Sequence, residues 1–146
     1  MANPLVPQGV INRLRASIVF VQYTNLNITA SFLGKEGISL SFEGQATTPI
    51  ETMTGVVQAP EPYQRVALKA HLLKTQFLAN AFKYQIETTS LIGDAVVRAD
   101  SSSLTPYQLS NVAIQTVDPL KFDGTDAGWT INFSGIYYIN SALWNV

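Results

Sequence analysis

The chain has 146 residues, with nine Lys or Arg, ten Asp or Glu, one His and no Cys. The length suits a single domain (residues 1–146) with a substantial core. Apolar residues make up 47% of the chain, which excludes a wholly disordered chain. The net charge of −1 excludes a nucleic-acid binder that works by neutralising phosphates, and the absence of Cys excludes disulfide frameworks and thiolate zinc sites.

The first twenty residues predict an irregular lead-in followed by a strand. Pro4 and Pro7 favour extended, irregular backbone. No basic segment precedes a long apolar run here, so we expect no export signal. From Asn12 apolar and polar residues alternate, which predicts a strand that includes Ile18 and Phe20. The longest apolar run of the whole chain, residues 18–21, is too short to cross a bilayer, and no membrane partner is expected.

A turn and a second strand follow. Gly34 and Gly37 bracket Lys35 and Glu36, which is typical of a turn. The alternation over residues 38–43 then predicts a half-buried strand, with Phe42 on its apolar face.

Residues 44–62 have a different composition. They are rich in Thr and contain three Pro residues, and they carry no core pattern. We interpret them as an exposed hairpin, a long arm that packs on a neighbouring copy rather than on its own domain. The residues expected to supply its contacts are Thr48, Ile50, Met53, Val56 and Val57.

The middle of the chain predicts a strand that runs directly into a helix. Alternation over residues 66–72 indicates the strand, and apolar residues at helical spacing indicate a helix over residues 75–88. Thr75 is its expected N-cap. The apolar stripe expected to pack on the sheet comprises Phe77, Leu78, Ala81, Phe82 and Ile86.

The rest of the chain predicts strands over residues 95–99, 107–117 and 129–139, with a tight turn over residues 123–128. The last strand turns Trp129, Ile131 and Phe133 to one face, as core residues. The prediction is therefore a mainly β fold: an antiparallel β-sandwich or open barrel of about six or seven strands, with one packed helix and the hairpin arm.

No residue pattern predicts catalysis or a cofactor. His71 lacks a recognisable nucleophile and orienting partner. Asp118, Asp123 and Asp126 surround a turn but lack the spacing of a calcium loop, and turn Asp residues more often bond their own backbone. We expect no enzyme, no metal and no cofactor. Charged residues are only 13% of the chain, against about 25% in typical domains, so we expect other copies to cover much of its surface.

Four phrases carry a resemblance to a known family: residues 34–38 (GKEGI), 61–63 (EPY), 71–76 (HLLKTQ) and 135–140 (GIYYIN). With the order of elements, they make the chain similar to the tube proteins of bacteriophage tails. The resemblance implies hexameric rings stacked into a hollow tube through which genomic DNA passes as a transient cargo. It also implies a sheath, baseplate and terminator proteins as partners. The implied location is the virion tail, assembled in the bacterial host cytoplasm.

The polar strand faces supply a candidate channel wall. If the apolar faces that carry Phe42, Ile131 and Phe133 form the core, the opposite faces can line a lumen. The candidate lumen residues are Ser39, Ser41, Glu43, Thr130, Asn132 and Ser134. Arg65, Lys69 and His71 form a basic face that we expect away from the channel or paired with acids.

Two other functions fit the same residues. One is a hexameric ring protein of type VI secretion, and the other is a monomeric β-sandwich that serves as an adhesin or binding module. The size of the particle in solution separates rings and tubes from a monomer.

Overall fold

The computed structural model describes residue 9, residues 16–99 and residues 104–145. Residues 12–15 of the first predicted strand lie outside this part. The strands are β1 (Ser17–Phe20), β2 (Leu33–Glu43), β3 (Thr47–Glu51), β4 (Val56–Pro60), β5 (Tyr63–Leu73), β6 (Leu91–Arg98), β7 (Tyr107–Val117) and β8 (Gly128–Tyr138). The helices are the α-helix α1 (Phe77–Thr88) and the short 3-10 helices η2 (Thr24–Leu26), η3 (Ala30–Phe32) and η4 (Ser141–Asn145).

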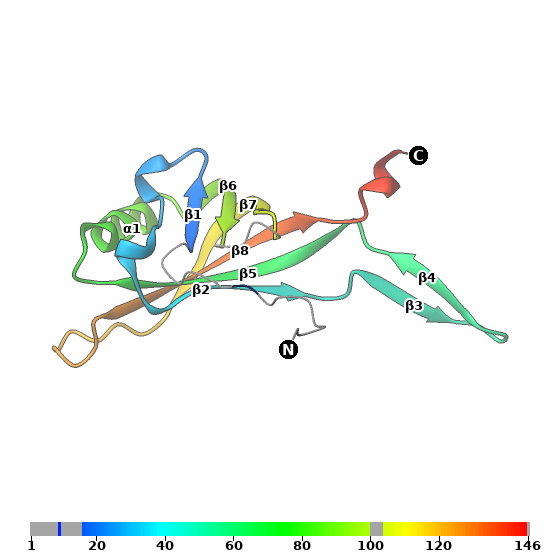
Figure 1. The fold of residues 1–146 in the computed structure, drawn as a ribbon, viewed down its shortest axis with the longest axis horizontal. Coiled ribbons are helices and arrows are strands. Elements are labelled where there is room, and N and C mark those ends of the chain that lie inside the picture. Colours follow the sequence, from blue (N-terminus) through cyan, green and yellow to red (C-terminus); the bar gives the residue numbers. More distant parts are fainter. Residues whose placement is uncertain (1–8, 10–15, 100–103, 146) are drawn as a thin grey trace, which may run out of the picture.

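Six strands form one antiparallel sheet in the order β1-β6-β7-β8-β5-β2, and β3 and β4 form a separate pair that projects from its end (Figure 1). The sheet curls around its core side as an open half-barrel, which confirms the predicted mainly β class in its open-barrel form. β5 and β8 pair over the full length of β5, from Tyr63 opposite Tyr138 to Leu73 opposite Gly128. This long pair is the axis on which the other elements are arranged.

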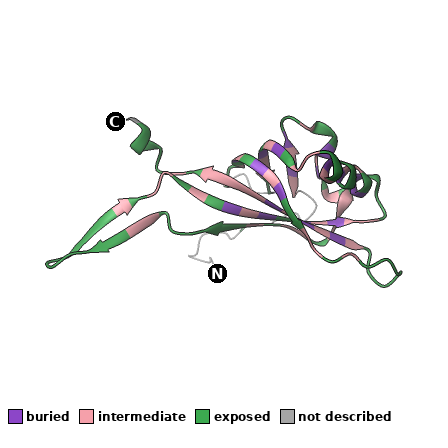
Figure 2. Cartoon of the chain, turned by 180° about the vertical axis from the view of Figure 1, so that it is seen from behind, coloured by how far each residue is buried: buried purple, intermediate pink, exposed green. Residues whose placement is uncertain are grey.

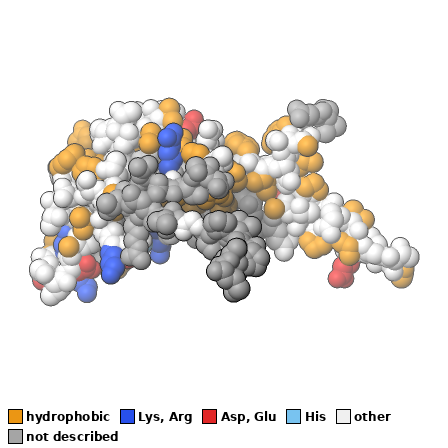
Figure 3. Space-filling view, viewed as in Figure 1, with side chains coloured by type: hydrophobic (Ala, Val, Ile, Leu, Met, Phe, Trp, Pro, Cys, Tyr) orange, Lys and Arg blue, Asp and Glu red, His pale blue; other side chains and the backbone are white. Residues whose placement is uncertain are grey.

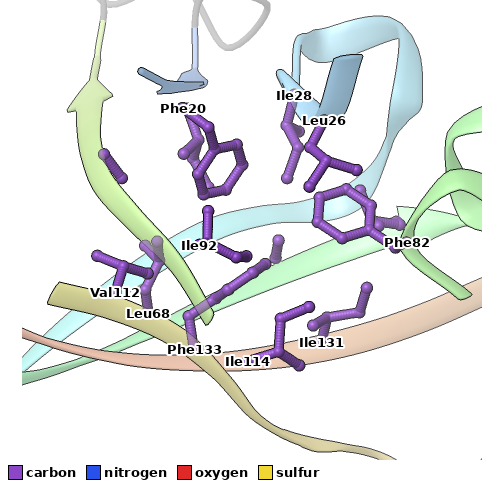
Figure 4. Packing of buried hydrophobic residues seen from close by; sticks show 14 of the residues in the cluster. Phe20, Leu26, Ile28, Leu68, Phe82, Ile92, Val112, Ile114, Ile131 and Phe133 are labelled. Atoms are coloured by element: carbon purple, nitrogen blue, oxygen red, sulfur yellow. The ribbon is translucent and has the colours of Figure 1, made fainter. Parts of the chain in front are cut away.

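The core lies on one face of the sheet, at the end far from the β3–β4 pair. α1, η2 and β1 cover this face, and the buried residues gather beneath them (Figure 2). Three rings meet at the centre: Phe20 of β1, Phe82 of α1 and Phe133 of β8, with centroids 5.8 to 6.2 Å apart (Figure 4). The predicted core residues Ile131 and Phe133 are fully buried, and Trp129 is also buried.

α1 begins later than predicted. Gln76, not Thr75, occupies the N-cap, and no side-chain hydrogen bond caps the helix. The residues of α1 that face the core include Leu78 and Phe82, whereas Phe77 is 73% exposed. The rings of Phe77 and Phe32 meet edge to face with centroids 5.2 Å apart. The prediction that Phe77 packs on the sheet is wrong, because a residue one position before Leu78 lies about 100° away around the helix.

The predicted turn at residues 34–37 is also wrong, because these residues belong to β2. Between Leu33 and Ile38 the pairing advances five residues along β2 but only two along β5, so the segment forms a bulge. Gly37 has φ +70°, which glycine adopts without a steric penalty. A bulge keeps the strand in the sheet while changing its register.

Phe42 lies where the half-barrel opens. It is on the core side of β2 but is 41% exposed, because β2 is the last strand of the sheet. Its ring contacts Tyr107 and Tyr137 at centroid distances of 5.6 and 5.7 Å. Phe42 is thus on the predicted face but only half removed from water.

We expect Phe82→Ala to lower the free energy of unfolding by about 3–5 kcal/mol, because it empties the centre of the ring cluster. The matched control is Phe77→Ala on the exposed side of the same helix, which should cost about 0.5–1.5 kcal/mol through the lost edge contact with Phe32. Urea unfolding followed by circular dichroism measures both. Equal losses would contradict the assignment of Phe82 to the core.

Candidate functional site: a polar sheet face and a projecting arm

The face of β2, β5, β8 and β7 that points away from the core is predominantly polar. Pairing places Ser39 beside Lys69, Lys69 beside Asn132, and Asn132 beside Thr116, so one row crosses all four strands. The next row carries Ser41 and Ser134 on either side of Ala67. We call this surface the polar face; its residues are Ser39, Ser41, Glu43, Arg65, Lys69, His71, Thr116, Thr130, Asn132 and Ser134.

All six candidate lumen residues lie on the polar face. The three from β2 are exposed and the three from β8 are half-buried. A shallow depression lined by Ser39, Ser41, Lys69, Thr116 and Asn132 crosses the middle of this surface. The structure therefore brings the six residues together on one side of one sheet.

Hydrogen bonds tie several of these side chains to their neighbours. Asn132 Nδ2 donates to Thr116 Oγ1 at 3.1 Å and to Asp118 Oδ1 at 2.9 Å. His71 Nδ1 and Thr130 Oγ1 are 3.0 Å apart, a hydrogen bond across β5 and β8. Asn132 thus connects β8 to the end of β7, which the strand pattern alone does not reveal.

Arg65, Lys69 and His71 are on the polar face too, so the expectation of a separate basic face is wrong. Residues two apart on a strand share a face, and β5 lies between β2 and β8, so its outward residues enter the same surface. Arg65 Nε is 3.9 Å from Glu43 Oε2, which agrees with the expected pairing with an acid. For Lys69, no ion-pair partner is found among the described residues.

The predicted arm is the β3–β4 hairpin. Ile50 is opposite Val57 on one side of the hairpin, and Glu51 is opposite Val56 on the other. These three aliphatic side chains are exposed, and Met53 at the turn is 100% exposed. Figure 3 shows hydrophobic side chains along the projecting hairpin. Four of the five predicted arm residues are therefore exposed, with Ile50 and Val57 on one side and Val56 on the other. Thr48 is half-buried, and its Oγ1 donates to Glu61 Oε1 at 3.2 Å.

The arm joins the sheet through residues 44–46 and 61–62. Glu61 N donates to Ala46 O at 2.9 Å, which closes the base of the hairpin. Asn140, just after β8, donates from Nδ2 to Ala46 O at 3.1 Å and to Glu61 O at 2.7 Å. No pattern in the sequence singles out Asn140 for this role.

An aromatic group next to the arm base was also missed. Tyr63, Tyr138 and Trp144 are exposed, and with Arg65 they line a hollow at the arm end of the polar face. The rings of Tyr138 and Trp144 meet edge to face with centroids 6.3 Å apart. The core pattern of β8 accounts for Trp129 and Phe133 but leaves these rings on the surface.

The acidic side chains in the turn between β7 and β8 form hydrogen bonds within the turn itself. Asp123 Oδ1 accepts from Thr125 Oγ1 at 2.6 Å and from Thr125 N, and these bonds hold the pKa of Asp123 below its usual range. Asp126 Oδ1 accepts from Gly128 N at 2.9 Å. No group of three metal-ligating side chains is found in the described part of the chain. Nor does any helix described there have the length and apolar character to cross a membrane.

The sequence matches no family model and no curated protein. Solved structures do share its fold. A chain of the anti-feeding prophage cap, described as a tube terminating cap, is 16% identical with a TM-score of 0.52, over 94% of this chain and 97% of that one. A chain of the PVC sheath-tube complex, from an extracellular contractile injection system in the extended state, is 14% identical with a TM-score of 0.50, over 90% and 94%. At this identity the likeness establishes the fold.

We expect Asn132→Ala to lower the free energy of unfolding by about 1–3 kcal/mol, because it removes two hydrogen bonds, one of them to a carboxylate. Ser41→Ala is the matched control on the same face. Ser41 is exposed, so its change should stay within about 0.5 kcal/mol. Thermal or urea unfolding of the two variants measures the difference. If Asn132→Ala costs no more stability than Ser41→Ala, the role of Asn132 in connecting β8 to the end of β7 is contradicted.

Proposed function

We propose that the chain is a structural subunit of a phage tail or tail-like particle, in which six copies form a ring and rings stack into a hollow tube. The observation that carries the proposal is the two-sided sheet. Four strands present one largely polar surface, and the whole core lies behind them. A surface of this kind suits the inner wall of a ring, and no catalytic role is proposed.

The size of the sheet suits the passage of a duplex. Four strands from each of six copies make about 24 strands, and a spacing of ~4.8 Å gives a backbone diameter of roughly 40–50 Å, depending on tilt. β2 is an edge strand of 11 residues in the isolated chain. Closure of a ring would pair such edges, which otherwise favour uncontrolled association.

The charges of the polar face also suit a cargo that must slide. Glu43 and Asp118, which accepts from Asn132 at the edge of the face, supply two negative charges against the two positive charges of Arg65 and Lys69. Most other residues of the face carry hydroxyl or amide groups. A strongly basic wall would hold DNA through counterion release. The near balance of charge on this face supports genomic DNA as a transient, non-specific cargo.

The two solved structures support the wider setting of the proposal. One belongs to a tube terminating cap and the other to a sheath-tube complex. We therefore propose further copies of this chain as its first partner and a sheath, baseplate or terminator protein as additional partners, in a tail assembled in a bacterial cytoplasm. A ring that ends a tube is the second candidate, favoured by the likeness to the cap.

We expect the purified chain to form six-fold rings or tubes with a central channel in negative-stain micrographs. Long tubes favour a tube subunit, and single rings favour a terminating ring.

Val57→Glu should prevent stacking, because it places a charge beside Ile50 on the apolar side of the arm.

The matched control is Gln58→Glu, which adds the same charge one residue along, on the other side of the hairpin. It should still stack. Both variants should unfold at the wild-type temperature, since the arm contributes no residue to the core. A wild-type chain that stays monomeric at high concentration in both low and high salt would contradict the proposal.

A lysine on the channel wall should retain DNA. We expect tubes of Ser41→Lys to hold short DNA duplexes more strongly than wild-type tubes at low salt, with the difference lost as salt rises. Thr88→Lys at the exposed end of α1 is the control for added charge away from the polar face. Co-sedimentation over a range of salt concentrations measures retention, and equal retention by both variants would place Ser41 outside the channel.

A further inference from the structure

We propose that Asn140 is the positioning residue that fixes the direction of the β3–β4 arm and joins it to the C-terminal segment. This inference rests on the proposed function in one respect, namely that the arm carries a contact between copies. The geometry of the clamp itself is independent of assembly.

The clamp consists of one side-chain amide between the two connections of the arm. Asn140 Nδ2 donates to Ala46 O, on the chain entering the hairpin, and to Glu61 O, on the chain leaving it, at 3.1 and 2.7 Å. Both partners are carbonyl oxygens, so only the nitrogen of the amide can face them. One side chain thereby holds both connections against the end of β8.

Few residues can do this at position 140. The backbone has φ +50°, in the left-handed region that asparagine tolerates better than most side chains. The amide nitrogen has two hydrogens, one for each carbonyl. Aspartate would have the same shape but no donor when ionised, and glycine would fit the backbone but lack the amide.

The arm has few other attachments. β3 and β4 form their own sheet and contribute nothing to the core. Gly44, at the entry, has φ +81°, and no atom outside its chain neighbours lies within 4 Å of the position that a Cβ would take. Besides the Glu61–Ala46 bond, the base of the arm has a backbone bond from Ile139 N to Pro62 O at 3.2 Å and a long bond from Gln64 Nε2 to Gly44 O at 3.4 Å. Neither of the latter two bonds links the entering connection, residues 44–46, to the leaving connection, residues 61–62. Five-residue strands are about 17 Å long, so a hinge rotation of about 20° would move the tip by about 6 Å.

Asn140 also starts the C-terminal helix. Leu143 N donates to Asn140 O at 2.9 Å, which forms the first turn of η4, and Trp144 of η4 packs against Tyr138. In Figure 1 the C-terminal segment and the arm leave the same end of the sheet. The arm base, the end of β8 and η4 are therefore one connected unit.

The direction of the arm can be measured with site-directed labels, because the chain has no Cys of its own and a label therefore attaches only at an introduced Cys. Spin labels at Thr54→Cys on the arm turn and Thr88→Cys on α1, diluted with unlabelled chain, report the arm direction by double electron–electron resonance. We expect a narrow distance distribution in the otherwise unchanged chain. Asn140→Asp and Asn140→Gly should broaden it at least twofold. They should also raise the concentration needed for assembly roughly tenfold, with an unchanged circular dichroism spectrum.

Asn111→Asp is the matched control, since Asn111 is an exposed asparagine with φ 54° whose side chain has no hydrogen bond within the described residues. It should leave the distribution narrow. A distribution that is broad already, that stays narrow in both Asn140 variants, or that broadens equally in Asn111→Asp would overturn the clamp. If Asn140→Asp broadens it but the parent chain never assembles, the tube proposal fails and the clamp stands.

Discussion

The pairing of β5 with β8 is the constraint on which the other features depend. The two strands pair without a register shift over the 11 residues of β5, so successive side chains alternate strictly between two environments. Val66, Leu68 and Ala70 face the core, and Arg65 and Lys69 face the opposite way. A shift of one residue would exchange the two faces, so the buried rings and the polar face are fixed together.

Much of the fold follows from local periodicity. The predicted strand over residues 107–117 has the bounds of β7, and the alternation around Ile131 and Phe133 identified the buried face of β8. Phe82 was recognisable because helical spacing and hydrophobicity agree there. These features depend on residues close in sequence, which is the information that a pattern contains.

The features that were missed depend on residues far apart. The sequence around Gly37 predicted a turn, because a pair of nearby glycines is compatible with a turn and with a β-bulge alike. Only the pairing of β2 with β5 distinguishes the bulge from the turn. The basic residues of β5 share a face with Ser39 and Asn132 because of strand order, which no single strand encodes. Asn140 binds carbonyls 94 and 79 residues away, so its neighbours in sequence give no signal.

The separation of the arm from the core has a consequence for how such a chain can diverge. Because Ile50, Met53 and Val57 are exposed and outside the core cluster, substitutions there leave the folding free energy almost untouched. The core residues around Phe133 have no such freedom. The arm, the surface proposed to contact other copies, can therefore change rapidly in evolution while the core keeps its shape, so new contacts can arise without loss of foldability.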